Sequence, residues 1–495
     1  MNEARTQRIA FGDFQTPDAL AAAVCRRLRE LGVSPASVVE PTCGAGAFVL
    51  AALDAFPGAQ ALCGVEINRG HLHLLEERLR GHPGHGKVRL QQADFFRTDW
   101  KALLAAAPGP LLVVGNLPWV TSSAQGAIGG ANLPAKSNFQ GRSGFEAISG
   151  QANFDISEWM LLELLRALRG RSADLAMLVK SAVARKVLAQ SAGMGVGLAQ
   201  AMLFGIDARQ AFGATVDACL LVMRLPGQDS PRACDYTVFE DLQAQQGRRV
   251  AHRDGLTVAD LDAFEAGRHL LGASPQKWRS GIKHDASAVM ELARTGADRY
   301  ENGLGERCSL EPDYLYPLLK GSDVASGKPW REKFVLVTQC TVGQPTDAIR
   351  DRAPRTWAYL AAHAAQLDAR ASRLHANKPR FSVFGVGEYT FRPWRIAVCS
   401  LYKRLQFRLV GPVEGRPVQF DDTVYFVSFE TEAQARGVLR VLQSQEAQAF
   451  LSSLIFWDEK RQIKAGLLNR FDWSRAQARG TASAAPECAA GTSPA

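Results

Sequence analysis

Several short apolar segments of this chain each give way to a polar side chain where the apolar run stops. They lead, in order along the chain, into Glu40, Glu66, Asp94 and Asn116. Short apolar runs bounded by turn residues are typical of buried strands, and helical patterns separate them here. Strands that alternate with helices form a mostly parallel sheet, and ligands bind where the carboxyl ends of such strands meet. We therefore expect a doubly wound α/β domain with these four side chains along one edge.

The last of these strand ends, Asn116-Leu117-Pro118-Trp119, presents an amide, a proline and an aromatic ring together. The Asn116 side-chain oxygen and the backbone carbonyl next to Pro118 can accept the two N–H bonds of a planar exocyclic amine, while Trp119 stacks on the base. Such contacts stabilise the positive charge that develops when the amine attacks an electrophile. The alternative is an ordinary strand-to-turn exit with Trp119 in the core.

Residues 40–48 combine a strand end, a Gly-rich turn and the start of a helix. Gly44 and Gly46 let the backbone approach a ligand where a Cβ would clash, and Glu40 can hold a cationic amine. No Gly-Lys-Ser/Thr follows, so the segment is not a P-loop. The turn predicts a site for a small ligand, although a Gly-x-Gly alone is a weak signal.

Two further strand ends extend this interpretation. Glu66 follows Glu40 at about the span of one βαβ unit, where an acid commonly accepts both ribose hydroxyls. Asp94 can accept an adenine amino proton while Phe95 packs on the ring. The alternatives are a surface acid for Glu66 and a core residue for Phe95. Together the strand ends predict an adenosine-containing ligand in the crevice.

In this order the segments resemble the motifs of an S-adenosylmethionine-dependent DNA adenine-N6 methyltransferase of the gamma arrangement, with a C-terminal target-recognition domain. Residues 11–17 resemble motif X, 40–48 motif I and 116–119 the catalytic motif IV, while Glu66 and Asp94-Phe95 stand at motifs II and III. The resemblance implies a Rossmann-like fold and S-adenosyl-L-methionine as cofactor. It also implies methylation of an adenine flipped out of duplex DNA. The cofactor-binding residues it implies are Thr16, Glu40, Thr42, Gly44, Gly46, Glu66, Ile67, Asp94 and Phe95, and the catalytic ones are Asn116, Pro118 and Trp119.

Residues 207–225 resemble the motif VIII region of the same family, in which Phe212 would pack on the extruded adenine beside Trp119. Leu117 departs from the usual Asn/Asp-Pro-Pro-aromatic motif and resembles the Asn-Leu-Pro-aromatic of rRNA adenine dimethylases. An RNA adenine or a protein glutamine therefore remains an alternative substrate. A catalytically silent DNA-binding homologue is the alternative from another class of protein.

The positive charge of the chain is concentrated between Arg350 and Arg408. This stretch contains 12 Lys or Arg residues and 3 Asp or Glu residues, an excess equal to the formal net charge of +9, and nine aromatic residues are interleaved with them. Basic and aromatic residues in alternation suit a polyanion with exposed bases. The alternative is a solvated basic surface over an aromatic core. Beside a methylase-like half, the pattern favours double-stranded DNA as the partner.

The length of 495 residues allows two or three domains. We expect a catalytic domain over 1–228, an α+β target-recognition domain over 235–475, and a disordered tail over 476–495, with a linker at 226–231. Residues 121–152 are rich in Gly, Ser, Ala and Asn and directly follow the tetrapeptide. We expect them to form a mobile loop that orders over DNA or the flipped base.

Several classes of protein are disfavoured. No apolar run is long enough to span a membrane, and residues 1–15 lack the apolar core of a signal peptide. The nine cysteines form no Cys-x-x-Cys, which disfavours a zinc site and indicates reduced thiols in a cytoplasmic protein that needs no metal. We expect a monomer, and the resemblance implies a separately encoded restriction endonuclease as a partner within a restriction-modification system.

Overall fold

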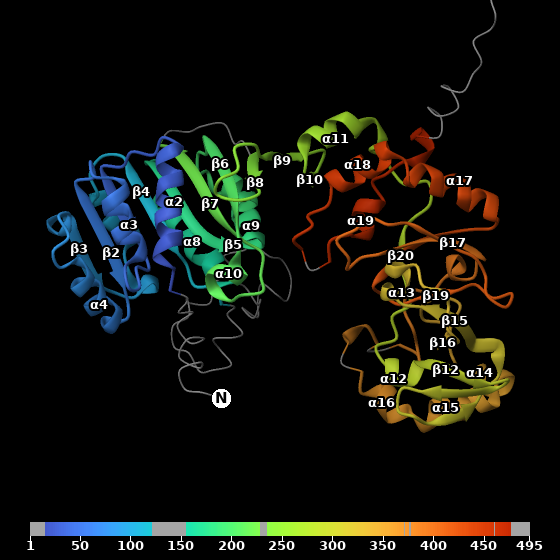
Figure 1. Ribbon diagram of the computed structural model, residues 1–495. Coiled ribbons are helices and arrows are strands. Elements are labelled where there is room, and N and C mark those ends of the chain that lie inside the picture. Colours follow the sequence, from blue (N-terminus) through green and yellow to red (C-terminus); the bar gives the residue numbers. More distant parts are fainter. Residues whose placement is uncertain are drawn as a thin grey trace, which may run out of the picture. The chain divides into compact units, whose positions relative to one another are not determined.

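The computed structural model describes residues 15–120, 155–227, 235–370, 372–375, 378–459 and 461–476. It divides into two compact units, residues 1–257 and 258–495, shown in Figure 1. The division lies later than the expected boundary at 228–235, because strands after that point join the sheet of the first unit. The expected mobile loop at 121–152, residues 11–14 of the motif X resemblance and most of the expected tail lie outside the described residues.

A ten-stranded sheet with the order β10-β9-β8-β6-β7-β5-β4-β1-β2-β3 organises the first unit, and the last residue of β10, Val258, is the first residue of the second unit. Its strands are β1 Ser37–Glu40, β2 Ala61–Glu66, β3 Val88–Gln92, β4 Leu111–Asn116, β5 Ser172–Lys180, β6 Gln200–Ile206, β7 Ala218–Pro226, β8 Tyr236–Phe239, β9 Arg248–Arg253 and β10 Leu256–Val258.

The half of this sheet that carries the predicted site is parallel. β1 pairs in parallel with β2 on one side and with β4 on the other, and β4 pairs in parallel with β5. β7 then lies antiparallel between β5 and β6. The predicted mostly parallel sheet is confirmed, and its central strands are apolar because both faces are covered. Every residue of β1 and the first five of β4 are buried.

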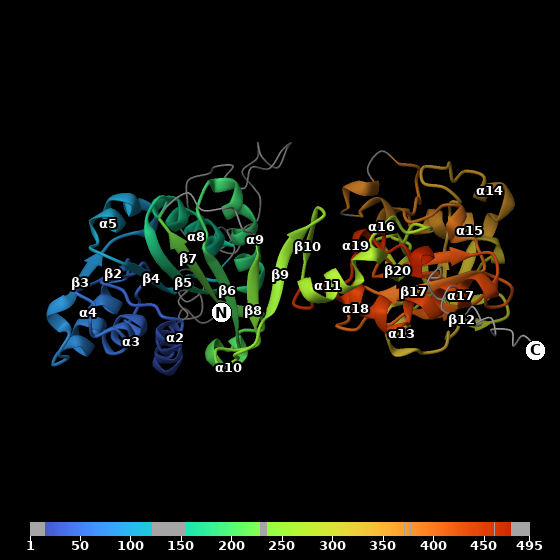
Figure 2. The same ribbon diagram turned by 90° about the horizontal axis from the view of Figure 1, so that it is seen from above.

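Helices cover both faces of the sheet, as Figure 2 shows: α2, α3, α4 and α10 lie on one side and α5, α8 and α9 on the other. Their bounds are α2 Asp18–Glu30, α3 Ala47–Ala55, α4 Arg69–Leu79, α5 Trp100–Ala106, α8 Ile156–Ala167, α9 Ser181–Ser191 and α10 Ala208–Phe212. Most begin at an Asp or Asn whose side chain accepts a backbone N–H of the first turn; Asn68 caps α4 and Asp155 caps α8 in this way.

The second unit contains two smaller sheets. A four-stranded sheet has the order β11-β20-β17-β18 and a six-stranded sheet the order β14-β13-β12-β16-β15-β19. The strands are β11 Arg279–Ser280, β12 Glu291–Gly296, β13 Arg299–Asn302, β14 Arg307–Ser309, β15 Leu315–Leu319, β16 Lys333–Leu336, β17 Trp394–Cys399, β18 Arg408–Val410, β19 Gln419–Phe420 and β20 Val424–Phe429. The helices are α11 Leu261–Gly267, α12 Ser287–Met290, α13 Gly321–Ser326, α14 Ile349–Arg352, α15 Pro354–Ala362, α16 Ala364–Asp368, α17 Glu432–Leu442, α18 Gln445–Ser453 and α19 Ala465–Leu468. Helices and mixed sheets in one unit agree with the expected α+β class.

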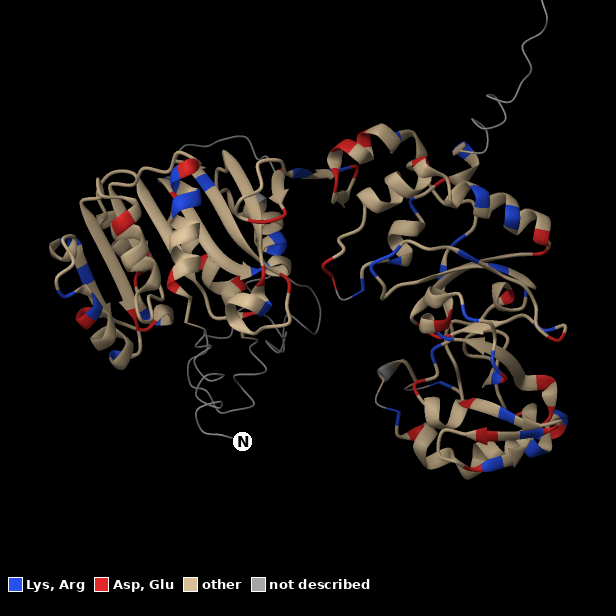
Figure 3. Ribbon diagram, in the orientation of Figure 1, with Lys and Arg blue, Asp and Glu red and all other residues tan. Residues whose placement is uncertain are grey.

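The basic and aromatic stretch 350–408 builds much of this second core. Tyr359, Phe381 and Phe407 are buried, whereas Tyr402 is 46% exposed, more than any other aromatic described in the stretch. Arg395 is fully buried between Phe420 and Phe426, and burial lowers the pKa of its guanidinium to about 9. The described part of the stretch therefore fits a basic surface over an aromatic core. Figure 3 shows that Lys and Arg are spread over many elements of the unit, with Asp and Glu among them.

Candidate active site

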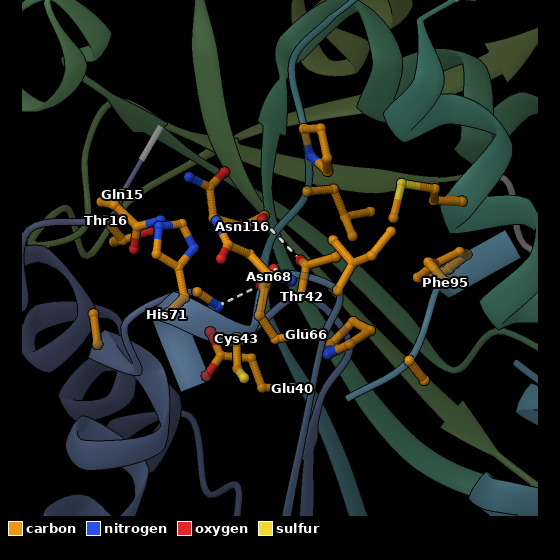
Figure 4. A pocket seen from close by; sticks show the side chains of 18 of the residues that line it. Gln15, Thr16, Glu40, Thr42, Cys43, Glu66, Asn68, His71, Phe95 and Asn116 are labelled. Atoms are coloured by element: carbon orange, nitrogen blue, oxygen red, sulfur yellow. Dashed lines mark hydrogen bonds between the residues drawn. The ribbon is translucent and has the colours of Figure 1, made fainter. Parts of the chain in front are cut away.

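A pocket lies where the carboxyl ends of β1, β2 and β4 meet (Figure 4). Its shape follows from the parallel pairing, which places these strand ends side by side. Of the residues predicted from the sequence, it is lined by Thr16, Glu40, Thr42, Gly44, Glu66, Ile67, Phe95, Asn116 and Pro118; Gly46, Asp94, Trp119 and Phe212 do not line it. In Figure 4, Thr16 and His71 lie toward one end of the pocket and Phe95 toward the other.

Glu40, at the end of β1, is a buried carboxyl in the pocket wall, 4% exposed. Among the described residues, its Oε2 atom has no hydrogen-bond partner. Burial, reinforced by the neighbouring charge of Glu66, raises the pKa of the Glu40 carboxyl well above its ordinary value. A buried carboxyl of this kind is costly unless a cationic ligand group pairs with it, so it marks a place for a bound cation.

Glu66, at the end of β2, connects the glycine-rich turn to the next helix. Its Oε2 accepts the backbone N–H of Gly44 at 2.9 Å, and its Oε1 accepts that of Asn68 at 2.8 Å. Asn68 in turn caps α4 by accepting the N–H of Gly70. The carboxylate is thereby held in one orientation, while its oxygens retain lone pairs for a hydroxyl-bearing ligand.

The turn at Gly44–Gly46 needs glycine for two different reasons. Gly46 caps α3 with a φ of 86°, and a Cβ there would lie 2.0 Å from Leu75 Cδ1. Gly44 has a φ of 48°, and a Cβ there would lie 2.7 Å from Gln15 Oε1. Gly44 therefore opens the backbone to the pocket, whereas Gly46 permits the packing of α3 against α4.

Asp94 occupies a different position from the one expected. Its Oδ1 accepts the N–H of Phe96 at 2.9 Å and caps the short 3-10 turn Phe95–Arg97, and the side chain borders a separate cavity beside Arg97. Ala93, Phe95 and Phe96 line the pocket instead. Phe95 is buried against Trp100, with ring centroids 4.6 Å apart.

The end of β4 brings the tetrapeptide to the same pocket. Asn116, Leu117 and Pro118 line it, and Thr42 Oγ1 donates to the backbone carbonyl of Asn116 at 3.1 Å. This bond joins the glycine-rich turn after β1 to the chain that leaves β4. The predicted cofactor half and the predicted acceptor half are thus joined directly.

Trp119 turns away from this pocket into the core. It is 7% exposed, its indole N–H donates to the carbonyl of Leu178 at 3.2 Å, and its ring lies edge-on to Phe212. The two aromatic residues predicted to enclose the target base therefore contact each other.

Comparison with known proteins places the chain in a family. It is 45% identical over 467 residues to the type II methyltransferase M.NspV of Nostoc sp. (strain ATCC 29411 / PCC 7524), covering 94% of this chain and 96% of the relative. The chain belongs to the type II methyltransferase family. No family model matches the sequence. Among solved structures, the type IIL restriction-modification enzyme MmeI in complex with DNA aligns over 94% of this chain at a TM-score of 0.51 and 12% identity, and the chain spans 65% of that enzyme.

In this type II methyltransferase, several residues that line the pocket were not among the predicted site residues. Gln15, Asn68 and His71 contribute polar groups, and Ile156 and Met160 of α8 form an apolar wall. Gln15 also accepts the N–H of Ala45 at 3.0 Å, which ties the segment before α2 to the glycine-rich turn. A polar residue after a strand end, such as Asn68, was a signal available in the sequence. The role of α8 was not, because its approach depends on tertiary packing.

Within the described ranges of the methyltransferase, no helix has the length and apolar character needed to cross a bilayer.

Proposed function

We propose that this methyltransferase transfers a methyl group from S-adenosylmethionine to the N6 amino group of an adenine in duplex DNA, as the modification enzyme of a restriction-modification system. The observation that carries the proposal is the shared pocket. Glu40 and Glu66, suited to a cofactor, and Asn116 with Pro118, suited to an amine, line the same cavity. The bond from Thr42 to the Asn116 carbonyl ties the two groups together.

The polar and apolar groups that line the pocket suit S-adenosylmethionine. When bound, this cofactor supplies an electrophilic methyl group on a sulfonium centre. The buried Glu40 carboxyl would accept its ammonium group, because that carboxyl has an oxygen atom without a hydrogen-bond partner among the described residues. Glu66 would accept the ribose hydroxyls, and Ile67 and Phe95 would enclose the adenine. Thr16, Thr42 and Gly44 complete the proposed cofactor contacts, and Gly46 supports them by shaping the turn.

On the acceptor side, the Asn116 side-chain oxygen and the carbonyl next to Pro118 would each accept one N–H of the adenine amine. The amine lone pair is delocalised into the ring, so two acceptors that favour a pyramidal nitrogen increase its nucleophilicity and stabilise the developing positive charge. The apolar side chains of Leu117, Ile156 and Met160 would lower the local dielectric constant and so strengthen both interactions. Positioning and electrostatics would account for the acceleration.

Double-stranded DNA as the substrate is supported by two considerations. MmeI, whose fold this chain shares at a TM-score of 0.51, was solved in complex with DNA. The chain also carries a net positive charge of +9, which suits a phosphate backbone. The N6 group is paired inside the duplex, so the adenine must leave the helix to reach Asn116. Stacking of that base between Trp119 and Phe212 would require their contact to open. The two ring centroids are 4.9 Å apart, whereas a ring inserted between them needs a separation of about 7 Å.

The test uses purified full-length protein, S-adenosylmethionine with a labelled methyl group, and three acceptors: plasmid DNA, total RNA and a release-factor-like protein. We expect label in the DNA and, after digestion to nucleosides, in N6-methyladenine. Label confined to RNA or to protein would refute the proposal. Label in a cytosine of the DNA would support DNA methyltransferase activity but refute adenine as its target.

A further inference from the structure

Lys180, the last residue of β5, binds two segments that flank the pocket. β5 runs parallel to β4 with Leu178 opposite Asn116, so Lys180 lies at the same sheet edge as the tetrapeptide. Its Nζ donates to the carbonyl of Trp119 at 2.9 Å and to Asp155 Oδ2 at 2.5 Å. The side chains of Lys180 and Asp155 are 22% and 8% exposed, so water screens this ion pair weakly.

The first of these contacts fixes the path of the chain after Pro118. Trp119 is bound to β5 at two points: its indole N–H donates to the Leu178 carbonyl, and its own carbonyl accepts from Lys180. Rotation of the backbone at Trp119 would break both bonds. The carbonyls beside Pro118 are consequently held in a direction set by β5.

The second contact fixes the start of α8. Asp155 caps this helix, and its Oδ1 accepts the N–H of Ser157 at 3.2 Å and the Ser157 hydroxyl at 2.5 Å. The N–H of Ile156 donates to the Val120 carbonyl at 2.9 Å, which brings the helix start beside the end of the tetrapeptide. α8 in turn places Ile156 and Met160 in the pocket wall.

We propose that Lys180, acting through Asp155, is a positioning residue for methyl transfer, an inference that rests on the proposed function. Neither residue lines the pocket. The ammonium group holds the amine-binding wall, formed by Asn116 to Pro118, at a fixed separation from the apolar wall formed by Ile156 and Met160. Because transfer depends on alignment within a fraction of an ångström, the loss of this link lowers the rate of the chemical step while leaving the cofactor contacts at β1 and β2 in place.

The experiment measures single-turnover methyl transfer to plasmid DNA, S-adenosylmethionine affinity by calorimetry and the melting temperature of each full-length variant. Lys180→Met removes the link. Asp155→Asn keeps an oxygen that can cap α8 but removes the charge, so it serves as the variant that retains the fold. Lys180→Arg tests rescue. Lys186→Met is the matched control, since Lys186 pairs with Glu158 of the same helix α8 at 3.2 Å but lies within α9 and not at the end of β5.

We expect Lys180→Met to reduce the single-turnover rate by about tenfold to a hundredfold, with cofactor affinity within about threefold of wild type. Lys180→Arg should recover most of the rate, Lys186→Met should retain it, and combining Lys180→Met with Asp155→Asn should be less than additive. Wild-type rates in Lys180→Met would overturn the proposal. Equal losses of rate and cofactor affinity would also overturn it, because they would indicate a purely structural role for Lys180. A change confined to salt-sensitive DNA binding would overturn it as well, because it would indicate that Lys180 contacts a phosphate. Failure of the wild-type protein to label DNA would refute the proposed function instead.

Discussion

The ring of Phe212 meets the indole of Trp119 edge-on, with centroids 4.9 Å apart and planes inclined by 69°. Trp119 follows the end of β4, and Phe212 is the last residue of α10. An edge-on aromatic pair is favourable in itself. If a flipped base stacks on Trp119, Phe212 is the side chain that must move.

Phe212→Ala should therefore affect the target base and spare the cofactor. Loss of one stacking partner costs about 1–3 kcal/mol of binding to the extruded base. We expect a reduced kcat/KM for DNA with S-adenosylmethionine affinity unchanged. Phe239→Ala is the control, because Phe239 stacks on Phe204 at 4.5 Å and not on Trp119. If both variants lose activity per folded molecule equally, Phe212 has no specific role.

Asn116→Ala should abolish most of the turnover. Removal of one preorganised polar group at the reacting centre costs about 10²–10³-fold in rate, and the contacts of Glu40 and Glu66 stay intact. Turnover and calorimetric binding of the cofactor check this. Gln92→Ala, at the end of β3 and outside the pocket lining, should behave as wild type. An Asn116→Ala enzyme with normal turnover would remove this residue from the mechanism.

Glu40→Gln should weaken cofactor binding and stabilise the free protein. In the folded state, burial raises the pKa of Glu40 above the ordinary 4.5, so the folded form holds its proton to higher pH than the unfolded chain does. Stability therefore falls as pH rises from about 4.5 through the folded pKa, and this penalty is fully present above the folded pKa. We expect the variant to melt at a higher temperature than wild type near neutral pH, with the difference vanishing below pH 4.5. A difference in melting temperature that stays constant at every pH would contradict the raised pKa of the Glu40 carboxyl.

Gly46→Ala should destabilise the first unit. The new Cβ would meet Leu75 at 2.0 Å in a backbone conformation with φ of 86°, so we expect a loss of about 1–3 kcal/mol in the free energy of unfolding. Urea denaturation measures it. Gly58→Ala is the matched control, because nothing lies within 4 Å of its Cβ position, and it should change stability by less than about 0.5 kcal/mol.

The strand ends could be predicted because their signal is local. An apolar run that stops at a polar residue identifies the edge of a parallel sheet, and Glu40, Glu66 and Asn116 follow that rule. Asp94 carries the same pattern but caps the turn that follows it, a competing use of Asp that sequence alone does not exclude. Ile156 and Met160 were missed because helix α8 reaches the pocket only through its packing.

Two other differences concern features that the order of residues along the chain does not reveal. The basic and aromatic residues of 350–408 favoured a nucleic-acid surface, with an aromatic core as the alternative. Phe381 and Phe407 are buried, because interleaving along the chain does not determine which side chains a fold buries. Similarly, the turn residues after β7 resembled a domain boundary, but the strand Tyr236–Phe239 pairs with β6 and extends the first sheet. This strand, β8, lies between β6 and β9 and joins them through backbone pairing, which leaves little trace in the side-chain pattern.

β1 has β2 as one neighbour and β4 as the other. The cofactor-binding end of β2 and the amine-binding end of β4 are therefore both positioned by one buried strand, β1. Its hydrogen bonds to β2 and β4 set the spacing on both sides. A shift of β1 along its axis would displace the Glu40 end relative to both partners at once, so neither half of the reaction can drift while the other stays in register. Substitutions that alter which amine is modified should accordingly accumulate beyond Pro118, because the chain there is no longer part of β4 and is not positioned by β1.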